Sequence, residues 1–189
     1  MGYSDIGCYG GEVDTKTLDD LAENGLRFSQ FYNTARCCPS RASLLTGLHP
    51  HQAGVGHMVG NYGPEEYSGR INKKSVTIAE VLQENGYGTY MSGKWHITRK
   101  EDIKKNIQVA FPKQRGFDGV YSFLAGAASY YWPAAMVRDN EFIDEEIKND
   151  EDYYITDAIS DNAVNYINEH VEKRSEDPFF MYVAYTAPH

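Results

Sequence analysis

The chain has 189 residues, of which 41% are hydrophobic and 24% are charged, an ordinary composition for a globular domain with its own core. Its net charge of −9 at pH 7 argues against a nucleic-acid-binding protein, because phosphate contacts need clustered Lys and Arg. No apolar run approaches the roughly 18 to 20 residues that a membrane span needs, and the first residues are not a signal peptide. Three cysteines, two of them adjacent, cannot form a normal disulfide framework, so the redox compartment stays open.

The first part of the chain reads as a loop followed by a helix. Residues 1–13 are rich in glycine and show no helical or strand periodicity, which is typical of a surface loop. Thr17 with an acidic residue three positions later, apolar residues at helical spacing and an Asn-Gly end predict a helix over residues 17–25. Residues 26–29 then alternate as a strand does. A second loop follows and leads to Cys37.

Cys37 lies where this second loop turns into a short helix. Proline is best tolerated at the first position of a helix, so we expect the helix to begin at Pro39, and Gly47 supplies a left-handed end. Unpaired backbone amides and the positive end of the helix dipole stabilise an anion beside Cys37. Arg41, about one turn along, adds a positive charge. The segment predicts an anion site with a reactive side chain; the competing interpretation is a buried structural thiol, the commonest role of a free cysteine.

The spacing of this segment matches a known pattern. Cys-x-Pro-Ser-Arg followed by Ala-x-Leu-Leu-Thr-Gly, residues 37–47, resembles the signature of type I sulfatases. In that family the first cysteine of the signature is oxidised to formylglycine, so the resemblance implies that Cys37 is the modified residue and Cys38 the variable position. A zinc or redox role for the adjacent pair is the weaker alternative, because the pair lacks Cys-x-x-Cys spacing.

Three histidines follow on a loop rich in Pro and Gly: His49, His51 and His57. A zinc site would need a cysteine or acidic partner at a recognised spacing, which this loop lacks. We therefore expect these histidines to line a pocket or to form hydrogen bonds within the loop.

A second group of candidate catalytic residues lies at the end of the next predicted strand. Residues 77–86 repeat the Thr-x-x-Glu capping box and the Asn-Gly end of a helix, residues 87–92 read as a strand, and Lys94 and His96 follow it. A Lys-x-His pair alone is more often on the surface than in a site. Gly-Tyr-x-Thr-x-x-x-Gly-Lys-Trp-His, residues 86–96, however, resembles the second sulfatase signature. Because ligands gather at the carboxyl ends of parallel strands, this pair is expected to meet the anion site there.

The second half of the chain mixes surface and core segments. Residues 97–115 are rich in charged side chains and read as an exposed insertion with a short helix at most and no chemistry. The aromatic segment of residues 115–133 is expected to form core and pocket wall. Residues 137–143 predict a hairpin around an Asp-Asn turn, and the acidic residues 144–152 predict a solvated link.

The last segments read as a helix and a buried strand. An apolar stripe over residues 155–171 predicts a helix packed on the sheet. Residues 178–185 form a continuous apolar run of strand length, which is typical of a central parallel strand. This run and its Thr-Ala-Pro-His end resemble the sulfatase segment whose histidine contacts the sulfate and the leaving oxygen, a position that the resemblance gives to His189. By the same resemblance Ser129 is the small polar residue that touches the nucleophile.

The resemblance implies hydrolysis of a sulfate monoester. One hydroxyl of the formylglycine hydrate attacks sulfur, the alcohol leaves, and the second hydroxyl expels sulfate. By position, Arg41 would hold the hydrate, Lys94 would clamp sulfate and nucleophile together, and His96 would accept the proton that lets sulfate depart; His189 would contact sulfate and leaving group. The implied substrate is an aryl or carbohydrate sulfate, and the implied protein partner is a formylglycine-generating enzyme.

The resemblance also implies a calcium ion held by oxygen ligands, chiefly carboxylates and an amide. Of these the chain supplies only Cys37, after oxidation, because the family's Asp-Asp pair is expected before residue 1 and its Asp-Asn pair beyond residue 189. We therefore expect a single partial catalytic domain over residues 1–189, inactive by itself and without tight calcium binding.

The expected fold class is α/β: a mostly parallel sheet flanked by helices on both faces, alkaline phosphatase-like and incomplete at both ends. Two other functions stay open, a phosphate or phosphonate monoester hydrolase of the same superfamily and a non-catalytic anion-binding fragment. Members of the family are commonly periplasmic, secreted or lysosomal, and the residues themselves leave the compartment unknown.

Overall fold

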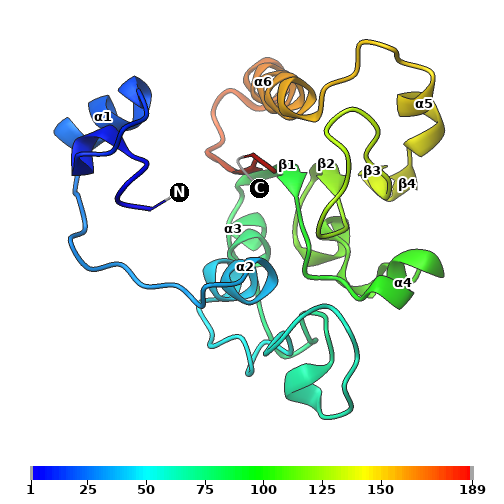
Figure 1. Cartoon of the computed structure of the whole chain (residues 1–189). Coiled ribbons are helices and arrows are strands. Elements are labelled where there is room, and N and C mark those ends of the chain that lie inside the picture. Colours follow the sequence, from blue (N-terminus) through cyan, green and yellow to red (C-terminus); the bar gives the residue numbers. More distant parts are fainter. Residues whose placement is uncertain (1, 188–189) are drawn as a thin grey trace. The chain divides into compact units, whose positions relative to one another are not determined.

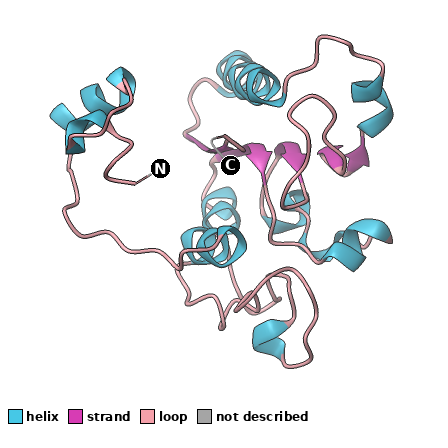
Figure 2. Ribbon diagram, in the orientation of Figure 1, coloured by secondary structure: helices cyan, strands magenta, loops and turns pink. Residues whose placement is uncertain are grey.

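A computed structural model describes residues 2–187. The described chain divides into two compact units, residues 2–33 and residues 34–187. Figure 1 traces the chain from end to end, and Figure 2 marks its helices and strands. The sheet and all the described candidate site residues belong to the second unit.

The first unit holds a 3₁₀ turn, Gly7–Tyr9, and helix α1, Lys16–Glu23. The residue before α1 is Thr15, so the predicted cap at Thr17 is wrong. The Thr15 hydroxyl accepts a hydrogen bond from Gly7 N at 2.8 Å and donates one to Asp19 at 3.0 Å. The threonine therefore joins the preceding turn to the helix and does not cap the helix's own amides.

The strand predicted over residues 26–29 is wrong, because these residues form a loop. Leu26 and Phe28 are 77% and 53% exposed, and the Phe28 carbonyl accepts a hydrogen bond from the Tyr9 hydroxyl at 3.0 Å. Alternating apolar residues favour a strand, but a strand also needs a neighbouring strand to pair its backbone groups. The described part of the chain supplies none here.

The second unit is built on a five-stranded sheet in the order β4-β3-β2-β1-β5. Three strands are parallel: β1 (Gly88–Lys94), β2 (Gly119–Phe123) and β5 (Phe179–Ala184). Strands β3 (Met136–Arg138) and β4 (Glu141–Phe142) form an antiparallel hairpin, which confirms the predicted hairpin. The sheet is therefore mixed, with a parallel half that contains β1 and β5.

Helices cover both faces of this sheet, with α6 on one face and α2 and α3 on the other (Figure 2), which confirms the predicted α/β layers. The helices are α2 (Cys37–Thr46), α3 (Ile78–Glu84), α4 (Lys100–Lys104), α5 (Asp144–Lys148) and α6 (Ile155–Arg174), with 3₁₀ turns at Glu65–Tyr67, Gln108–Ala110 and Pro112–Arg115. The acidic link is thus partly helical, and Ile147 on α5 is buried. None of the helices within residues 2–187 combines the length and the apolar character that crossing a bilayer demands.

Strand β5 lies at the outer edge of the described sheet, so the prediction of a central strand is wrong for residues 2–187. It pairs with β1, and Phe179 and Val183 are 43% and 39% exposed. A continuous apolar run shows that both faces of a strand are apolar, but it does not show how many strands pair with it.

Residues 97–115 are not the exposed insertion that their charges predict. Ile97 and Phe111 are fully buried in the main apolar cluster. Asp102 is 4% exposed and receives a hydrogen bond of 2.6 Å from Arg70. The charged side chains of this stretch were a misleading signal, because some of them are paired inside the fold. The segment supports the end of β1.

Helix α3 has the predicted capping box, and a buried arginine completes it. The Thr77 hydroxyl accepts a hydrogen bond from Glu80 N at 3.1 Å, and the Glu80 carboxylate accepts one from Thr77 N at 2.7 Å. Arg115, 4% exposed, donates to the same carboxylate at 3.0 and 3.2 Å and to the carbonyls of Asn72 and Ser75. The start of α3 is thereby joined to the turn that precedes β2.

Candidate functional site

Cys37 is the first residue of α2, two residues earlier than the predicted start at Pro39. A proline in the first turn still costs no helical hydrogen bond, because the first amides of a helix have no partner within it. Gly47 ends the helix in the left-handed conformation with φ 67°, and its amide donates to Ser43 O at 2.8 Å, which confirms the predicted end. The thiol of Cys37 is therefore held at a helix N-terminus, where the dipole favours negative charge.

Strand β1 carries Lys94 as its last residue and His96 just beyond it. The backbone bends sharply here, with positive φ of 121° at Gly93 and 55° at His96. A Cβ at position 93 would overlap the Ala184 carbonyl oxygen of β5, so only glycine allows the two strands to lie this close.

Trp95 fixes the direction of this bend. Its ring is fully buried, and its Nε1 donates to Ala110 O at 2.7 Å and to the Thr98 hydroxyl at 3.0 Å. Its ring also packs edge-on against Phe117 with centroids 6.0 Å apart. Because Trp95 lies between the two candidate residues of this corner, its anchoring holds both in place.

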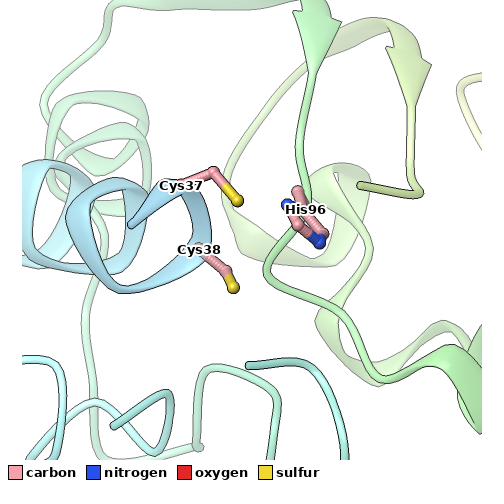
Figure 3. Close-up of side chains that lie close together, drawn as sticks. All are labelled: Cys37, Cys38 and His96. Carbon is pink, nitrogen blue, oxygen red and sulfur yellow. The ribbon is translucent and has the colours of Figure 1, made fainter. Parts of the chain in front are cut away.

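The two predicted groups of site residues, Cys37 with Arg41 and Lys94 with His96, lie close together in the structure. The Arg41 guanidinium on α2 donates to Lys94 O at 2.7 Å and to the Tyr182 hydroxyl of β5 at 3.1 Å. The ligand atoms of Cys37 and His96 lie within 4.8 Å of each other. Figure 3 shows the side chain of Cys37 directed from α2 towards His96, in the loop after β1, with Cys38 beside it.

A loop after β2 closes the site from one side. Lys94 Nζ donates to Gly126 O at 2.5 Å. A Cβ at position 126 would overlap the His96 ring, so the loop backbone lies against the imidazole. Lys94 and His96 are consequently only 2% and 4% exposed.

The electrostatic environment of the site is positive and poorly solvated. Burial, and then the nearby Arg41 charge, lower the pKa of Lys94 below its usual value. Burial raises the pKa of the Tyr182 hydroxyl, and the Arg41 charge opposes that rise. Burial, with the Cys37 thiol beside it, raises the pKa of Cys38 to about 12. An anion bound here would offset the repulsion between Arg41 and Lys94.

The remaining predicted site residues have different positions. Ser129 is exposed in the loop between β2 and β3, and its hydroxyl accepts hydrogen bonds from the amides of Tyr131 and Trp132 at 3.1 and 3.2 Å. Its described contacts are within its own loop, and its contact with the nucleophile stays a prediction. His189 lies outside the described residues, so its role also stays a prediction.

Two of the loop histidines form a hydrogen bond within the loop, one of the two predicted roles, because Nδ1 of His49 and Nδ1 of His51 lie 3.2 Å apart. The rings of His49 and His51 stack with centroids 4.9 Å apart, and His51 also meets the edge of Tyr67. The His57 ring packs against Tyr62. The backbone carbonyl oxygen of His57 lies 3.8 Å from Cys38 Sγ. The backbone of this loop therefore reaches the site, although the imidazole of His57 packs elsewhere.

Two contributors were missed from the sequence, Tyr182 and Gly126. Tyr182 lies in the middle of the apolar strand β5 and carries its only side-chain hydroxyl. A buried tyrosine hydroxyl usually has a hydrogen-bond partner, and here the partner is Arg41. Gly126 acts through its carbonyl and its lack of a side chain, and no sequence pattern marks such a position.

The comparison with protein families shows to which family the chain belongs. A family model described as Sulfatase matches residues 1–189. The chain belongs to the sulfatase family. As a family, sulfatases use formylglycine and calcium. The two signatures that predicted the site are thus the signatures of its own family.

Curated sulfatases are similar to this chain over its whole length. The identity is 34% to an arylsulfatase of Klebsiella aerogenes, with coverage of 100% of this chain and 41% of that protein. It is 30% to arylsulfatase J of Mus musculus, with coverage of 100% and 31%. The chain thus spans less than half the length of these sulfatases.

Solved structures confirm the fold. The structure of Ps i-CgsB in complex with k-i-k-neocarrahexaose matches with a TM-score of 0.80 and 31% identity, over 100% of this chain and 43% of that one. The structure of BT4656 in complex with its substrate D-glucosamine-2-N,6-O-disulfate matches with a TM-score of 0.70 and 28% identity, over 99% and 32%. The sheet described here is therefore that of a sulfatase.

The described residues do not fit a calcium ion. Calcium takes six to eight oxygen ligands, chiefly carboxylates and carbonyls. Around Cys37 the described side chains instead offer thiols, an imidazole, an ammonium and a guanidinium group. Arg41 and Lys94 would repel a cation that lacked carboxylate ligands.

Proposed function

We propose that this chain is part of an enzyme that hydrolyses sulfate monoesters of aryl or carbohydrate alcohols, with formylglycine derived from Cys37 as nucleophile. The observation that carries the proposal is the convergence of Cys37, Arg41, Lys94 and His96 from two separate signatures in one buried, positive site. The sulfatase family and the sulfated substrate in the BT4656 structure support the same chemistry.

Arg41 and Lys94 bind the anion in this proposal. Burial, and then the nearby Arg41 guanidinium, lower the pKa of Lys94. Both cations can donate hydrogen bonds to sulfate oxygens. Hydrogen bonds from charged donors are about twice as strong as neutral ones, and a site that excludes water strengthens them. The pair therefore holds the ester with its sulfur beside the residue at position 37.

His96 is the proton acceptor. Formylglycine, once hydrated, supplies two hydroxyls on one carbon: one takes the sulfuryl group from the alcohol and the other, on losing its proton, expels sulfate. The ring of His96 lies within 4.8 Å of the side-chain atom of residue 37, so a small shift of that residue, or one bridging water, would bring the proton within reach of the ring. The buried Lys94 holds a sulfate oxygen and the nucleophile together. His189 would contact the sulfate and the leaving oxygen.

Three finer features belong to this proposal by family membership. In the complete protein, calcium would bind through residue 37, as formylglycine, together with oxygen ligands other than the side chains described around it. A formylglycine-generating enzyme would convert the thiol. An exported location, in the periplasm, outside the cell or in the lysosome, is proposed on the same ground.

The test is a comparison of two substrates on the complete protein. Hydrolysis of 4-nitrophenyl sulfate should be at least tenfold faster than that of 4-nitrophenyl phosphate, and should scale with the fraction of Cys37 converted, read as a loss of about 18 Da in its peptide (SH and H exchanged for O). Cys37→Ala should abolish turnover, and Cys8→Ser, in the first unit, should leave it unchanged. Faster phosphate hydrolysis would identify a phosphomonoesterase, and no turnover by fully converted protein would identify an anion-binding module.

A further inference from the structure

Cys37, Cys38 and His96 form a cluster that the sulfatase proposal uses only in part. The two sulfur atoms and one ring nitrogen all lie within 4.8 Å of one another (Figure 3). Within residues 2–187 no other set of three His, Cys, Asp or Glu side chains is gathered so closely. Catalysis needs Cys37 and His96, but it gives no role to the thiol of Cys38.

A third sulfur atom, that of Met58, lies beside this cluster. Met58 Sδ is 3.5 Å from Cys38 Sγ, and Cys38 itself is fully buried. Two thiols, an imidazole and a thioether are soft ligands, which favour Zn²⁺ or Cu⁺ over the hard cations Ca²⁺ and Mg²⁺. The ligand chemistry is therefore the opposite of what the family's calcium needs.

The spacing of the cluster suits a tetrahedral ion. Bonds of about 2.3 Å to sulfur and 2.0–2.1 Å to nitrogen place tetrahedral ligand atoms roughly 3.5 to 3.8 Å apart. The observed atoms, within 4.8 Å of one another, need to approach by about 1.3 Å at most. Cys37 can supply this movement, because it is the first residue of α2 and is only partly buried.

Charge balance also favours a divalent thiophilic ion. Arg41 and Lys94 oppose any net gain of positive charge beside them. When Zn²⁺ displaces one proton from each thiol, two positive charges enter and two leave, so the net charge of the buried cluster is unchanged. The reaction transfers no electrons, and its two protons go to solvent.

We propose that the folded chain, with Cys37 still a thiol, binds one Zn²⁺ through Cys37, Cys38 and His96, with Met58 beside the fourth position. The inference does not rest on sulfate hydrolysis, because it concerns the unconverted thiol. It has a direct consequence for maturation: conversion of Cys37 removes one of two thiolates, so zinc binding marks the unconverted protein. A zinc-loaded chain also has its Cys37 thiolate and His96 occupied by metal.

The experiment uses Cd²⁺ as a spectroscopic substitute for Zn²⁺ and Cys8→Ser as the background, so that only two thiols remain. Titration of the reduced, unconverted protein with Cd²⁺ should develop the ultraviolet thiolate-to-cadmium absorption of two Cd–S bonds and saturate at one ion per chain. Zn²⁺ should then bleach this band stoichiometrically. A tenfold excess of Ca²⁺ should leave it unchanged.

Matched variants identify the ligands. Cys38→Ala should halve the absorption and weaken Zn²⁺ binding by more than the about 10 to 100-fold that is typical for losing a supporting residue. His96→Gln should weaken binding while keeping both Cd–S bonds. His51→Ala should change neither, which separates this cluster from the His49 and His51 pair.

Three outcomes would overturn the inference: no thiolate absorption in the Cys8→Ser protein, absorption of one Cd–S bond alone, or equal Zn²⁺ affinity in Cys38→Ala. If Cys38→Ala does not fold, the number of Cd–S bonds in the parent protein decides the question. Fully converted protein should lack the two-thiolate band whether or not it hydrolyses sulfate esters, so the two proposals fail independently.

Discussion

Two arginines of the second unit have opposite surroundings. Arg115 is 4% exposed, and its charge is matched by the Glu80 carboxylate with hydrogen bonds of 3.0 and 3.2 Å. Arg41 is half-buried and donates to a carbonyl and a hydroxyl, and no carboxylate among residues 2–187 forms an ion pair with it.

The difference is the one expected between a structural cation and the anion-binding cation proposed for this site. Burying a charge is costly unless a partner compensates it. Arg115 has its partner within the fold and so contributes to stability, whereas Arg41, set against Lys94, leaves positive potential for an incoming anion. The missing carboxylate at Arg41 is what the proposed anion-binding role requires, and the carboxylate at Arg115 is what a structural role requires.

The largest expected effect is the loss of the structural arginine. Arg115→Met should lower the free energy of unfolding by about 3 to 5 kcal/mol, because Glu80 and two carbonyls lose their buried donor. Urea denaturation measures this change. Arg174→Met, which removes solvent-screened ion pairs to Asp177 and Asp118, is the control and should cost much less. Equal losses of stability in the two variants would contradict the structural role of Arg115.

Arg41→Met should show the reverse pattern in the active enzyme. We expect turnover of an aryl sulfate to fall by about 10² to 10³-fold, the usual cost of losing one donor to developing negative charge. The free energy of unfolding should change by less than about 1 kcal/mol, because the lost positive charge had been repelling Lys94. A large loss of stability with turnover retained would contradict the assignment of Arg41 to binding.

A third prediction concerns pH and the lowered pKa of Lys94. The folded state binds this proton less tightly than the unfolded state, so the destabilisation is complete at low pH and is relieved as pH rises from the folded pKa towards the unfolded value of 10.5. The free energy of unfolding of the wild-type protein should therefore rise relative to that of Lys94→Met as pH rises towards 10.5. The measurement is the free energy of unfolding of both proteins as a function of pH. The same pH dependence in both would show that burial and Arg41 do not perturb the pKa of Lys94.

The smallest effect is expected at an exposed ion pair. Arg138 donates to both carboxylate oxygens of Glu146 at 2.9 Å, which lowers the pKa of Glu146, yet the two side chains are 49% and 59% exposed. Solvent screening limits such pairs to about 0.2 to 1 kcal/mol.

This contribution is present above the unfolded pKa of Glu146 and is lost as pH falls through the lower, folded pKa. Glu146→Gln should therefore be slightly less stable than wild type at neutral pH, and the difference should vanish in acid. Thermal melting of the two proteins across this pH range is the measurement. A difference that persists in acid would have to come from something other than the carboxylate charge.

The sequence predicted the parts of the fold that local rules determine. The capping box of α3 and the glycine end of α2 stand where the sequence placed them, because each depends on residues within one helical turn. Cys37, Arg41, Lys94 and His96 were also predicted to meet, and they do so although only Lys94 and His96 lie at the end of a strand of the sheet.

The errors concern features that depend on distant residues. The strand over residues 26–29 lacks a neighbour, and the position of β5 depends on which strands pair with it. Residues 97–115 were placed on the surface because charged side chains usually lie there, but Arg115 finds Glu80 35 positions away. Tyr182 was missed for the same reason, because its partner Arg41 lies 141 positions away.

The close approach of β1 to β5 at Gly93 sets how much variation the site can tolerate. In a library with every amino acid at this position, we expect glycine to be the sole survivor, because alanine already meets the Ala184 carbonyl oxygen. Engineers who want a new substrate range should therefore leave this backbone crossing intact. The exposed loop around Ser129 is the place to diversify.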